Sequence, residues 1–295
     1  MNLQEQLKEL KPTKEFFIGI DSDGCAFDTM EIKQKECFCP NFIKYYGLQK
    51  ISKYARETWE FTNLYSKTRG INRFLAMLET FRLLEQRPEV HARGMKFPDI
   101  AALIKWTREE TKLGNPALIE YARKVNNPDI DLALEWSLKV NHDIKEMVHG
   151  MPPFPGVRES LEKLNGRADA LVVSQTPLEA LEREWEENGI EGFVRLICGQ
   201  EYGTKAEHLA LAAKGKYPDD KILMIGDAPG DYQAAKANDV LFFPINPGHE
   251  ESSWDRLLNE GLDKFFAGTF AGKYETMLLE EFDSFLPERP SWKVL

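Results

Sequence analysis

The fold is decided by residues 16–24, which read Phe16-Phe17-Ile18-Gly19-Ile20-Asp21-Ser22-Asp23-Gly24. The apolar and β-favouring run predicts a buried strand. Two aspartates and a glycine follow it, so the backbone can turn and aim both carboxylates beyond the sheet edge, where open parallel α/β sheets bind their ligands. Two carboxylates this close repel each other, and a cation would relieve the repulsion. The alternative is an ordinary polar turn, which Asp and Gly commonly form.

The composition bounds the class of protein. The chain has 295 residues, enough for a substantial core in two lobes, and a formal net charge of −10 that argues against nucleic-acid or anionic-membrane partners. The sequence has no apolar run of about 18 residues, the length of a transmembrane helix, and its first residues do not resemble a signal peptide. A cytoplasmic location is expected, and a reducing compartment fits four cysteines without metal or redox spacing, Cys25, Cys37, Cys39 and Cys198.

Residues 31–150 show helical periodicity and no convincing strand. Ile71, Phe74, Leu75, Leu78 and Phe81 recur at spacings of three and four, as on one helix face. The block has the size of a domain. We therefore expect an all-helical domain at 31–150, inserted into a core domain made of 1–30 and 151–295.

From residue 151 onward, predicted helices and strands alternate. Strands are expected near 170–173, 193–198, 221–225 and 240–243, with helices between them. Such alternation predicts an α/β fold in which a Rossmann-like parallel sheet has helices on both faces. The tail from about residue 252 reads as helical, but the pattern does not place it.

Polar residues follow the predicted strands where each one ends. The second strand is followed by Ser174-Gln175-Thr176, and Thr176 with Glu179 predicts a capping box at a helix N-terminus, a natural anion site. Thr176 could simply cap that helix, so Ser174 is favoured as the phosphate ligand. Lys205 opens the next helix, where a cation is unfavourable with the helix dipole unless acidic groups hold it; the alternative is a solvated surface lysine.

The fourth strand ends in Gly226-Asp227-Ala228-Pro229-Gly230-Asp231. Two more carboxylates therefore reach the edge that carries Asp21 and Asp23. Four aspartates beside one lysine would be badly destabilised without a metal, and oxygen ligands around a phosphate suit Mg²⁺. The alternative role for Asp231 is to cap the helix that follows.

The order of these motifs resembles the haloacid dehalogenase superfamily, from about residue 16 to 247. The resemblance rests on four motifs: Asp21-x-Asp23-Gly24 after a strand, Ser174 after a strand, Lys205 opening a helix, and Gly226-Asp227-x-x-x-Asp231. The helical insertion after the first motif is similar to the C1-type cap of β-phosphoglucomutase-like and phosphatase members. Gln175 stands where many members have Asn or Gly.

The resemblance implies roles for these residues. Asp21 would attack phosphorus and form an aspartyl-phosphate, and Asp23 would protonate the leaving oxygen and then activate water. Asp21, the Asp23 carbonyl and Asp227 would hold Mg²⁺, with Asp231 bound directly or through water or Lys205. The expected phosphate-binding residues are Ser174, Gln175 and Lys205.

The carboxylate of Asp23 narrows the subclass. Family dehalogenases lack it and phosphonatases carry a small residue there, so a C–O–P substrate is implied. The cap would close over the site and select the substrate. Residues 69–73, Arg69-Gly70-Ile71-Asn72-Arg73, resemble a substrate-contacting cap segment, so Arg69 or Arg73 could bind a second anionic group; ordinary exposed arginines at a helix start are at least as good a reading.

Three functions stay open from the sequence. The first is a Mg²⁺-dependent phosphatase acting on a small phosphorylated metabolite. The second is a phosphomutase of the β-phosphoglucomutase type, which would use the same aspartates. The third is a non-catalytic binding protein, against which the complete carboxylate set argues. The sequence indicates neither the substrate nor the oligomeric state.

Overall fold

A computed structural model describes residues 3–292 and divides them into two compact units. One unit consists of residues 3–30 and 150–286, and the other of residues 31–149 and 287–292. Each is described by itself below. Within the described residues, no helix is both long and apolar enough to cross a membrane.

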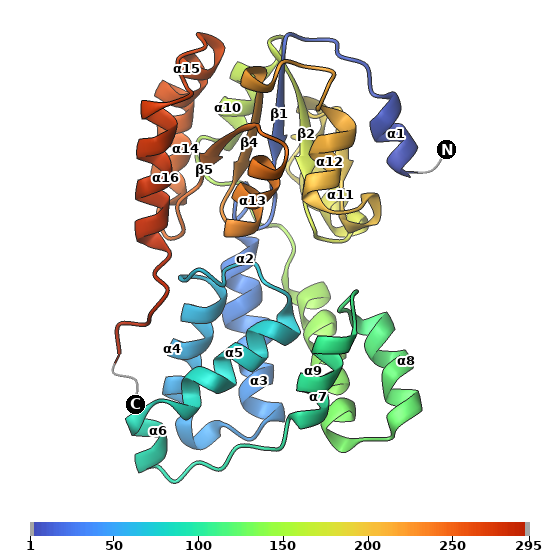
Figure 1. Cartoon of the computed structure of the whole chain (residues 1–295), viewed down its shortest axis with the longest axis vertical. Helices are drawn as coiled ribbons and strands as arrows, with labels where there is room; N and C mark the ends of the chain where they lie inside the picture. Colours follow the sequence, from blue (N-terminus) through green and yellow to red (C-terminus); the bar gives the residue numbers. More distant parts are fainter. Residues whose placement is uncertain (1–2, 293–295) are drawn as a thin grey trace. The chain divides into compact units, whose positions relative to one another are not determined.

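The first unit is built on a five-stranded parallel sheet (Figure 1). Its strand order is β3-β2-β1-β4-β5, so β1 lies at the centre between β2 and β4. The strands are β1 (Phe16–Ile20), β2 (Ala168–Val173), β3 (Leu196–Cys198), β4 (Ile222–Gly226) and β5 (Leu241–Pro244). All pairs are parallel, so the carboxyl ends of all strands lie at one edge. The α/β fold predicted from the alternation is confirmed.

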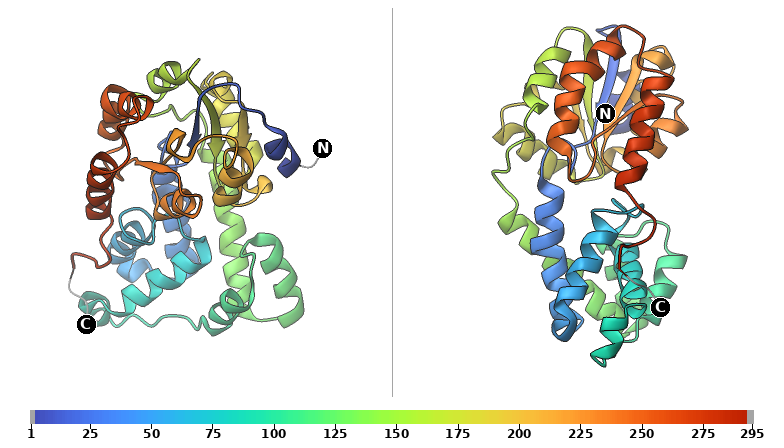
Figure 2. Two further views of the ribbon diagram at one scale, coloured as in Figure 1. Left: turned by 45° about the horizontal axis from the view of Figure 1, so that its top comes forward. Right: turned by 90° about the vertical axis from the view of Figure 1, so that its left-hand side faces the viewer.

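Different helices pack on the two faces of the sheet, because successive side chains in a strand point to opposite faces. Phe16, Ile18 and Ile20 point into a core that includes side chains of α10, α11, α14 and α15. Phe17 points into the opposite core, with side chains of α1, α12 and α13. These helices span Leu3–Glu9 (α1), Val157–Leu164 (α10), Leu178–Glu187 (α11), Lys205–Ala212 (α12), Pro229–Ala237 (α13), Glu250–Arg256 (α14) and Leu262–Phe266 (α15). Figure 2 shows the layers from two further sides.

Helix α16 (Lys273–Phe285) covers the β5 edge of the sheet, where unpaired backbone groups would otherwise be exposed. Its Glu275 accepts a hydrogen bond from the Phe242 amide at 3.0 Å. It also contributes Leu278 to one sheet face and Phe282 to the other. The tail that the sequence pattern did not place is thus the edge cover of the sheet.

In the second unit, every regular element within residues 31–149 and 287–292 is helical. Its core is rich in large aromatic side chains, including Phe42, Trp59, Phe74, Trp106 and Trp136. Helix α2 (Thr29–Ile32) leads into it, followed by α3 (Cys39–Tyr45), α4 (Ser52–Asn63), α5 (Arg73–Glu85), α6 (Pro88–Ala92), α7 (Ala101–Glu109), α8 (Asn115–Val125) and α9 (Pro128–Met147).

Residues 287–292 pack with the helical unit, whereas the sequence analysis assigns everything after 151 to the core domain. The Trp292 ring meets Phe61 of α4 edge-on at 5.3 Å, and the Arg87 guanidinium lies 4.4 Å from the Trp292 ring centre. The Lys67 amide donates to the Pro287 carbonyl at 3.4 Å. These contacts join residues far apart in sequence, which local periodicity does not reveal.

Candidate active site

The loop after β1 presents Asp21 and Asp23. Gly24 has φ 79°, a left-handed conformation in which a side chain would be strained, and this allows the turn. The Asp21 amide donates to the Ile225 carbonyl at 2.9 Å, which extends the β1–β4 pairing to the first aspartate. Asp21 is buried, whereas Asp23 is half-buried. The two carboxylates therefore leave the strand in different environments.

The loop after β4 holds Asp231 rigidly at the start of α13. One oxygen, Asp231 Oδ2, accepts hydrogen bonds from the amides of Asp227 (3.1 Å) and Ala228 (3.0 Å). Asp231 thus caps α13, which begins at Pro229, but as its third residue and not as the N-cap residue, which is Ala228. Gly226 makes room for it, because a Cβ there would lie 2.4 Å from the Asp231 Cβ.

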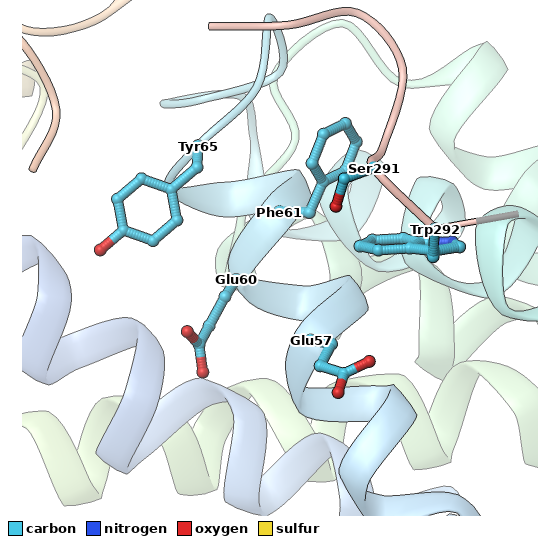
Figure 3. Close-up of a pocket in the computed structure, with 6 residues that line it drawn as sticks. All are labelled: Glu57, Glu60, Phe61, Tyr65, Ser291 and Trp292. Atoms are coloured by element: carbon cyan, nitrogen blue, oxygen red, sulfur yellow. The ribbon is translucent and has the colours of Figure 1, made fainter. Parts of the chain in front are cut away.

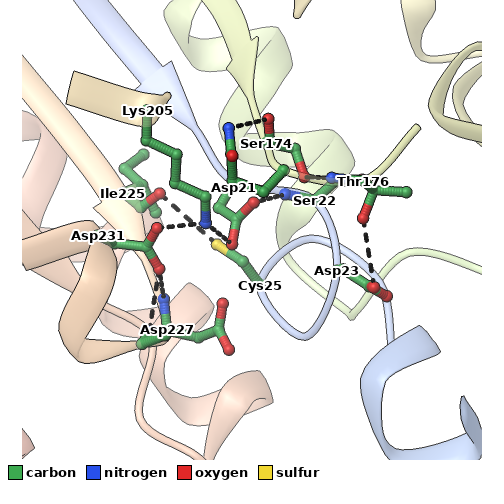
Figure 4. A network of polar contacts seen from close by, with 12 residues as sticks. Asp21, Ser22, Asp23, Cys25, Ser174, Thr176, Lys205, Ile225, Asp227 and Asp231 are labelled. Atoms are coloured by element: carbon green, nitrogen blue, oxygen red, sulfur yellow. Dashed lines mark hydrogen bonds and ion pairs between the residues drawn. The ribbon is translucent and has the colours of Figure 1, made fainter. Parts of the chain in front are cut away.

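Lys205 joins the two loops (Figure 4). Its Nζ lies 2.8 Å from Asp21 Oδ2 and 2.5 Å from Asp231 Oδ1, with both carboxylates buried. The helix itself is capped by Thr204 and Glu207, which form a reciprocal capping box. Lys205 is therefore not the solvated surface lysine of the alternative interpretation. It lies among the acidic groups that offset its unfavourable place at a helix N-terminus.

Negative charge exceeds positive charge in this cluster. Burial raises the pKa of Asp21 well above its usual range; Lys205 opposes the rise, and the neighbouring Asp231 and Asp227 add to it. Burial would lower the pKa of Lys205, but Asp21 and Asp231 outweigh burial and raise it, so the amine stays charged. One ammonium among three buried carboxylates leaves a site in which a further cation would be favourable.

The donor set fits a small divalent cation. Asp21, Asp227 and Asp231 each offer a carboxylate oxygen, and these oxygens lie within 4.8 Å of one another. Buried oxygen donors of this kind suit Mg²⁺. Asp23, included in the predicted metal set through its carbonyl, is not part of this carboxylate group. Both oxygens of Asp231 already accept hydrogen bonds, one of them from Lys205, so its contact to a metal is better made through water than directly.

The Ser174–Thr176 segment follows β2, beside the end of β1 (Figure 4). Ser174 is buried, and its Oγ accepts a hydrogen bond from the Thr176 amide at 3.3 Å. The Gln175 side-chain amide donates to the carbonyls of Ser174 and Gly203 at 3.2 and 2.8 Å. Gln175 thus fixes the loop in this structure, and its direct contact with phosphate stays a prediction.

The predicted capping box of Thr176 and Glu179 is wrong. Pro177 is the N-cap residue of α11 and supplies no side-chain acceptor. The Leu178 amide instead donates to the Glu201 carboxylate at 3.0 Å. The Thr176 hydroxyl therefore has no capping role. It donates instead to Asp23 Oδ2 at 3.4 Å.

Two hydroxyls at Asp23 were missed as site residues. Thr29 donates to Asp23 Oδ1 and Thr176 donates to Asp23 Oδ2. Both stabilise the charged carboxylate and fix its orientation. Thr29 lies only six residues after Asp23 in the sequence, whereas the position of Thr176 depends on the β1–β2 pairing.

The two cap arginines lie in the helical unit with internal partners. Arg69 is buried and donates to the Leu64 carbonyl at 2.9 Å. Arg73 donates to Ser137 and Asn141 at 3.1 and 2.6 Å, and burial lowers its pKa to about 10. Their contact with substrate stays a prediction.

The helical unit also has an open hollow beside α4 (Figure 3). Its walls combine two carboxylates with aromatic rings, and its lining residues are Glu57, Glu60, Phe61, Tyr65, Ser291 and Trp292. None of these six residues is cationic, and the two carboxylates would repel phosphate, so this hollow is poorly suited to a phosphorylated ligand.

Comparison with protein families gives one match. Residues 100–245 match the model of the haloacid dehalogenase-like hydrolases. This segment contains Ser174, Lys205 and Asp227 but not Asp21. Among curated proteins, no sequence matches the chain.

Solved structures of similar fold come from several bacteria. A proposed phosphoglycolate phosphatase from Lactobacillus delbrueckii subsp. bulgaricus is 15% identical, with a TM-score of 0.50 over 86% of this chain and 99% of that one. A HAD-superfamily hydrolase of subfamily IA from Geobacter sulfurreducens is 16% identical, with a TM-score of 0.42 over 80% and 89% of the two chains. A proposed beta-phosphoglucomutase from Thermotoga maritima is 14% identical, with a TM-score of 0.43 over 84% and 99%.

Proposed function

Because residues 100–245 match the haloacid dehalogenase-like hydrolases, we propose that the chain is an enzyme of that class, a Mg²⁺-dependent phosphatase that hydrolyses a small phosphate monoester. One observation carries the proposal: Lys205 binds Asp21 and Asp231 at the strand edge that also presents Asp227. This is a nucleophile, a cation and metal-type ligands in one cluster. Carboxylates buried this close to one another repel, and a bound cation would offset the repulsion.

In the proposed reaction, a carboxylate oxygen of Asp21 attacks phosphorus, and the P–O bond to the ester oxygen breaks while the C–O bond stays intact. Asp23 gives its proton to the leaving oxygen, which departs as an alcohol, and an aspartyl-phosphate forms on Asp21. Asp23, now a carboxylate, accepts a proton from water, which attacks phosphorus, breaks the P–O bond to Asp21, releases inorganic phosphate and regenerates the Asp21 carboxylate. The hydrogen bonds from Thr29 and Thr176 hold the Asp23 carboxylate in one orientation for the second step, in which it accepts the proton from water.

Lys205 and Ser174 bind the phosphoryl oxygens in this proposal, because a charged ammonium and a buried hydroxyl stabilise an anion that develops next to them. Asp21 and Asp227 are the proposed metal ligands, and Asp231 supports them from its fixed place. Bound Mg²⁺ would neutralise charge on the phosphoryl group and permit the approach of the Asp21 carboxylate.

The experiment is a phosphate-release assay across several dozen phosphorylated metabolites, with Mg²⁺ or with EDTA. Metal-dependent release by the wild type and its loss in Asp21→Asn, with folding unchanged by circular dichroism, support the proposal. No release from any ester in the presence of Mg²⁺ would contradict it and favour a binding protein. Isomerised sugar phosphate with little free phosphate would instead assign the mutase reaction.

A further inference from the structure

Ser22 separates Asp21 from Asp23, and its side chain is completely buried. Its hydroxyl donates a hydrogen bond to Glu184 Oε2 and accepts one from Trp185 Nε1, each at 3.0 Å. Both partners belong to α11, so one hydroxyl ties that helix to the loop that carries the two aspartates. A buried hydroxyl is costly without partners, so these contacts select a single orientation of Ser22.

The backbone of Ser22 organises the same loop. Its amide donates to Asp21 Oδ1 at 2.8 Å, while Lys205 takes the other oxygen of that carboxylate. Its carbonyl accepts hydrogen bonds from three amides further along the loop, those of Cys25 (3.3 Å), Ala26 (2.9 Å) and Phe27 (3.0 Å). A change in the backbone conformation at Ser22 would therefore reorient the Asp21 carboxylate and disturb the turn that carries Asp23.

Helix α11 connects this loop to the proposed phosphate-binding segment. It begins at Leu178, two residues after Thr176, and reaches Ser22 one to two turns later through Glu184 and Trp185. The Trp185 ring is fully buried and packs edge-on against Phe27 at 5.9 Å. The indole is thus fixed by packing as well as by its N–H bond. A rigid helix that contacts both segments sets the distance between them.

We propose that Ser22, Glu184 and Trp185 are positioning residues that hold the Asp21 carboxylate in line with a phosphate bound beside Ser174. The inference rests on the proposed phosphatase activity, and none of the three residues touches the reacting atoms. Misplacement of a nucleophile by about 1 Å can cost about 100-fold in rate. The hydrogen bonds between Ser22 and α11 limit such misplacement of the Asp21 carboxylate.

The test is steady-state hydrolysis of p-nitrophenyl phosphate with Mg²⁺ by Ser22→Ala, Trp185→Phe and Glu184→Ala. We expect kcat to fall about tenfold or more, with KM unchanged, because binding groups are intact while the nucleophile is misaligned. Glu184→Gln keeps an acceptor oxygen and should restore most of the rate. Glu186→Ala, on an exposed position of α11, is the matched control and should equal the wild type. The double variant Ser22→Ala/Trp185→Phe should be no slower than Ser22→Ala, since both lose the same link.

Unchanged kcat in Ser22→Ala and Glu184→Ala would overturn the inference, and so would a rise in KM alone. If Trp185→Phe fails to fold, the two other variants still decide. If the wild type hydrolyses no ester, the proposed function fails, and positioning is read from crystal structures of the wild type and Ser22→Ala. A displaced Asp21 carboxylate in the variant supports it, and an unchanged one overturns it.

Discussion

Lys205 Nζ lies 2.8 Å from Asp21 Oδ2, although the two residues are 184 positions apart in sequence. The same ammonium contacts Asp231, so three segments of the α/β unit meet at one charge. These buried groups depend on one another for charge balance. The stability and the proposed chemistry of the unit can therefore be tested at the same residues.

Replacement of Lys205 by methionine should destabilise the protein. Loss of one partner of a buried ion pair typically costs about 3–5 kcal/mol, because the remaining charges stay buried. We expect a loss of this order in urea unfolding with EDTA, and a smaller one with Mg²⁺. Lys205→Arg keeps the charge and is the control. Equal unfolding midpoints for wild type and Lys205→Met in EDTA would contradict the charge-balance argument.

Asp21→Asn should separate stability from activity. Burial and the neighbouring Asp231 and Asp227 outweigh Lys205 and raise the pKa of Asp21, so an ionised Asp21 is strained there without a metal. A neutral amide should raise the melting temperature in EDTA by a few degrees, while turnover falls by at least about 1,000-fold because the nucleophile is gone. Differential scanning calorimetry and phosphate release measure the two effects. A lower melting temperature than the wild type would refute the electrostatic account.

Magnesium should stabilise the native state. At 100 times its dissociation constant, a ligand specific to the native state adds about 2.7 kcal/mol, so thermal unfolding should shift upward with Mg²⁺. Asp227→Asn should remove most of this shift. The control is Glu146→Gln, because Glu146 belongs to a second group of metal-type side chains, with His142 and Asp143, on the helical unit. A shift lost in the control and retained in Asp227→Asn would place the cation elsewhere.

Asp169 should contribute to stability in a pH-dependent way. Burial would raise its pKa, but hydrogen bonds from the Thr13 hydroxyl and amide, the Tyr217 hydroxyl and the Lys14 amide outweigh burial and lower it. A lowered native-state pKa gives stability that is present above the unfolded pKa, near 3.8, and lost as pH falls through the native value. Asp169→Asn should therefore be less stable than wild type at pH 7, with the gap narrowing at acidic pH.

Urea unfolding between pH 3 and pH 7 measures this gap. Asp220→Asn, on an exposed surface position, is the matched control and should follow the wild type throughout. A gap between Asp169→Asn and the wild type that stays constant with pH would show that the carboxylate charge is not the cause.

Gly226→Ala should impair activity more than its size suggests. The new Cβ would lie 2.4 Å from the Asp231 Cβ, so Asp231 would have to shift from the position in which it contacts Lys205. Phosphate release should fall by at least about tenfold, since a small misplacement of site groups is costly. Gly230→Ala is the control four residues on: its Cβ meets nothing within 4 Å, and a helical alanine should add about 0.4–1 kcal/mol of stability. Normal activity in Gly226→Ala would contradict the steric argument.

The sequence could predict which residues meet at the carboxyl ends of the parallel strands. Parallel pairing carries Asp21 and Asp227 to one edge whatever the helices do, so the α/β fold and the meeting of their loops followed from the motifs. Contacts set by tertiary structure could not be read in the same way. The motif at Thr176 looks like a capping box, as does that at Thr204, yet only Thr204 caps, because Glu201 occupies the competing position.

Other misses have the same cause. Glu275 meets an edge-strand amide, and Asp169 gathers partners from residues 13, 14 and 217, none of them close in sequence. Ser22 carried a local signal, since it is a hydroxyl between two aspartates at the end of an apolar strand. Its partners on α11 required the folded structure.

The return of residues 287–292 to the helical unit affects how separable the two units are. The chain passes between them near residues 30, 149 and 286 rather than only at the two ends of an insertion. Deletion of residues 31–149 would remove both Phe61 and Arg87, so the Trp292 indole would lose these two packing partners. A chimaera that exchanges this helical unit between relatives would therefore have to exchange residues 287–292 together with residues 31–149.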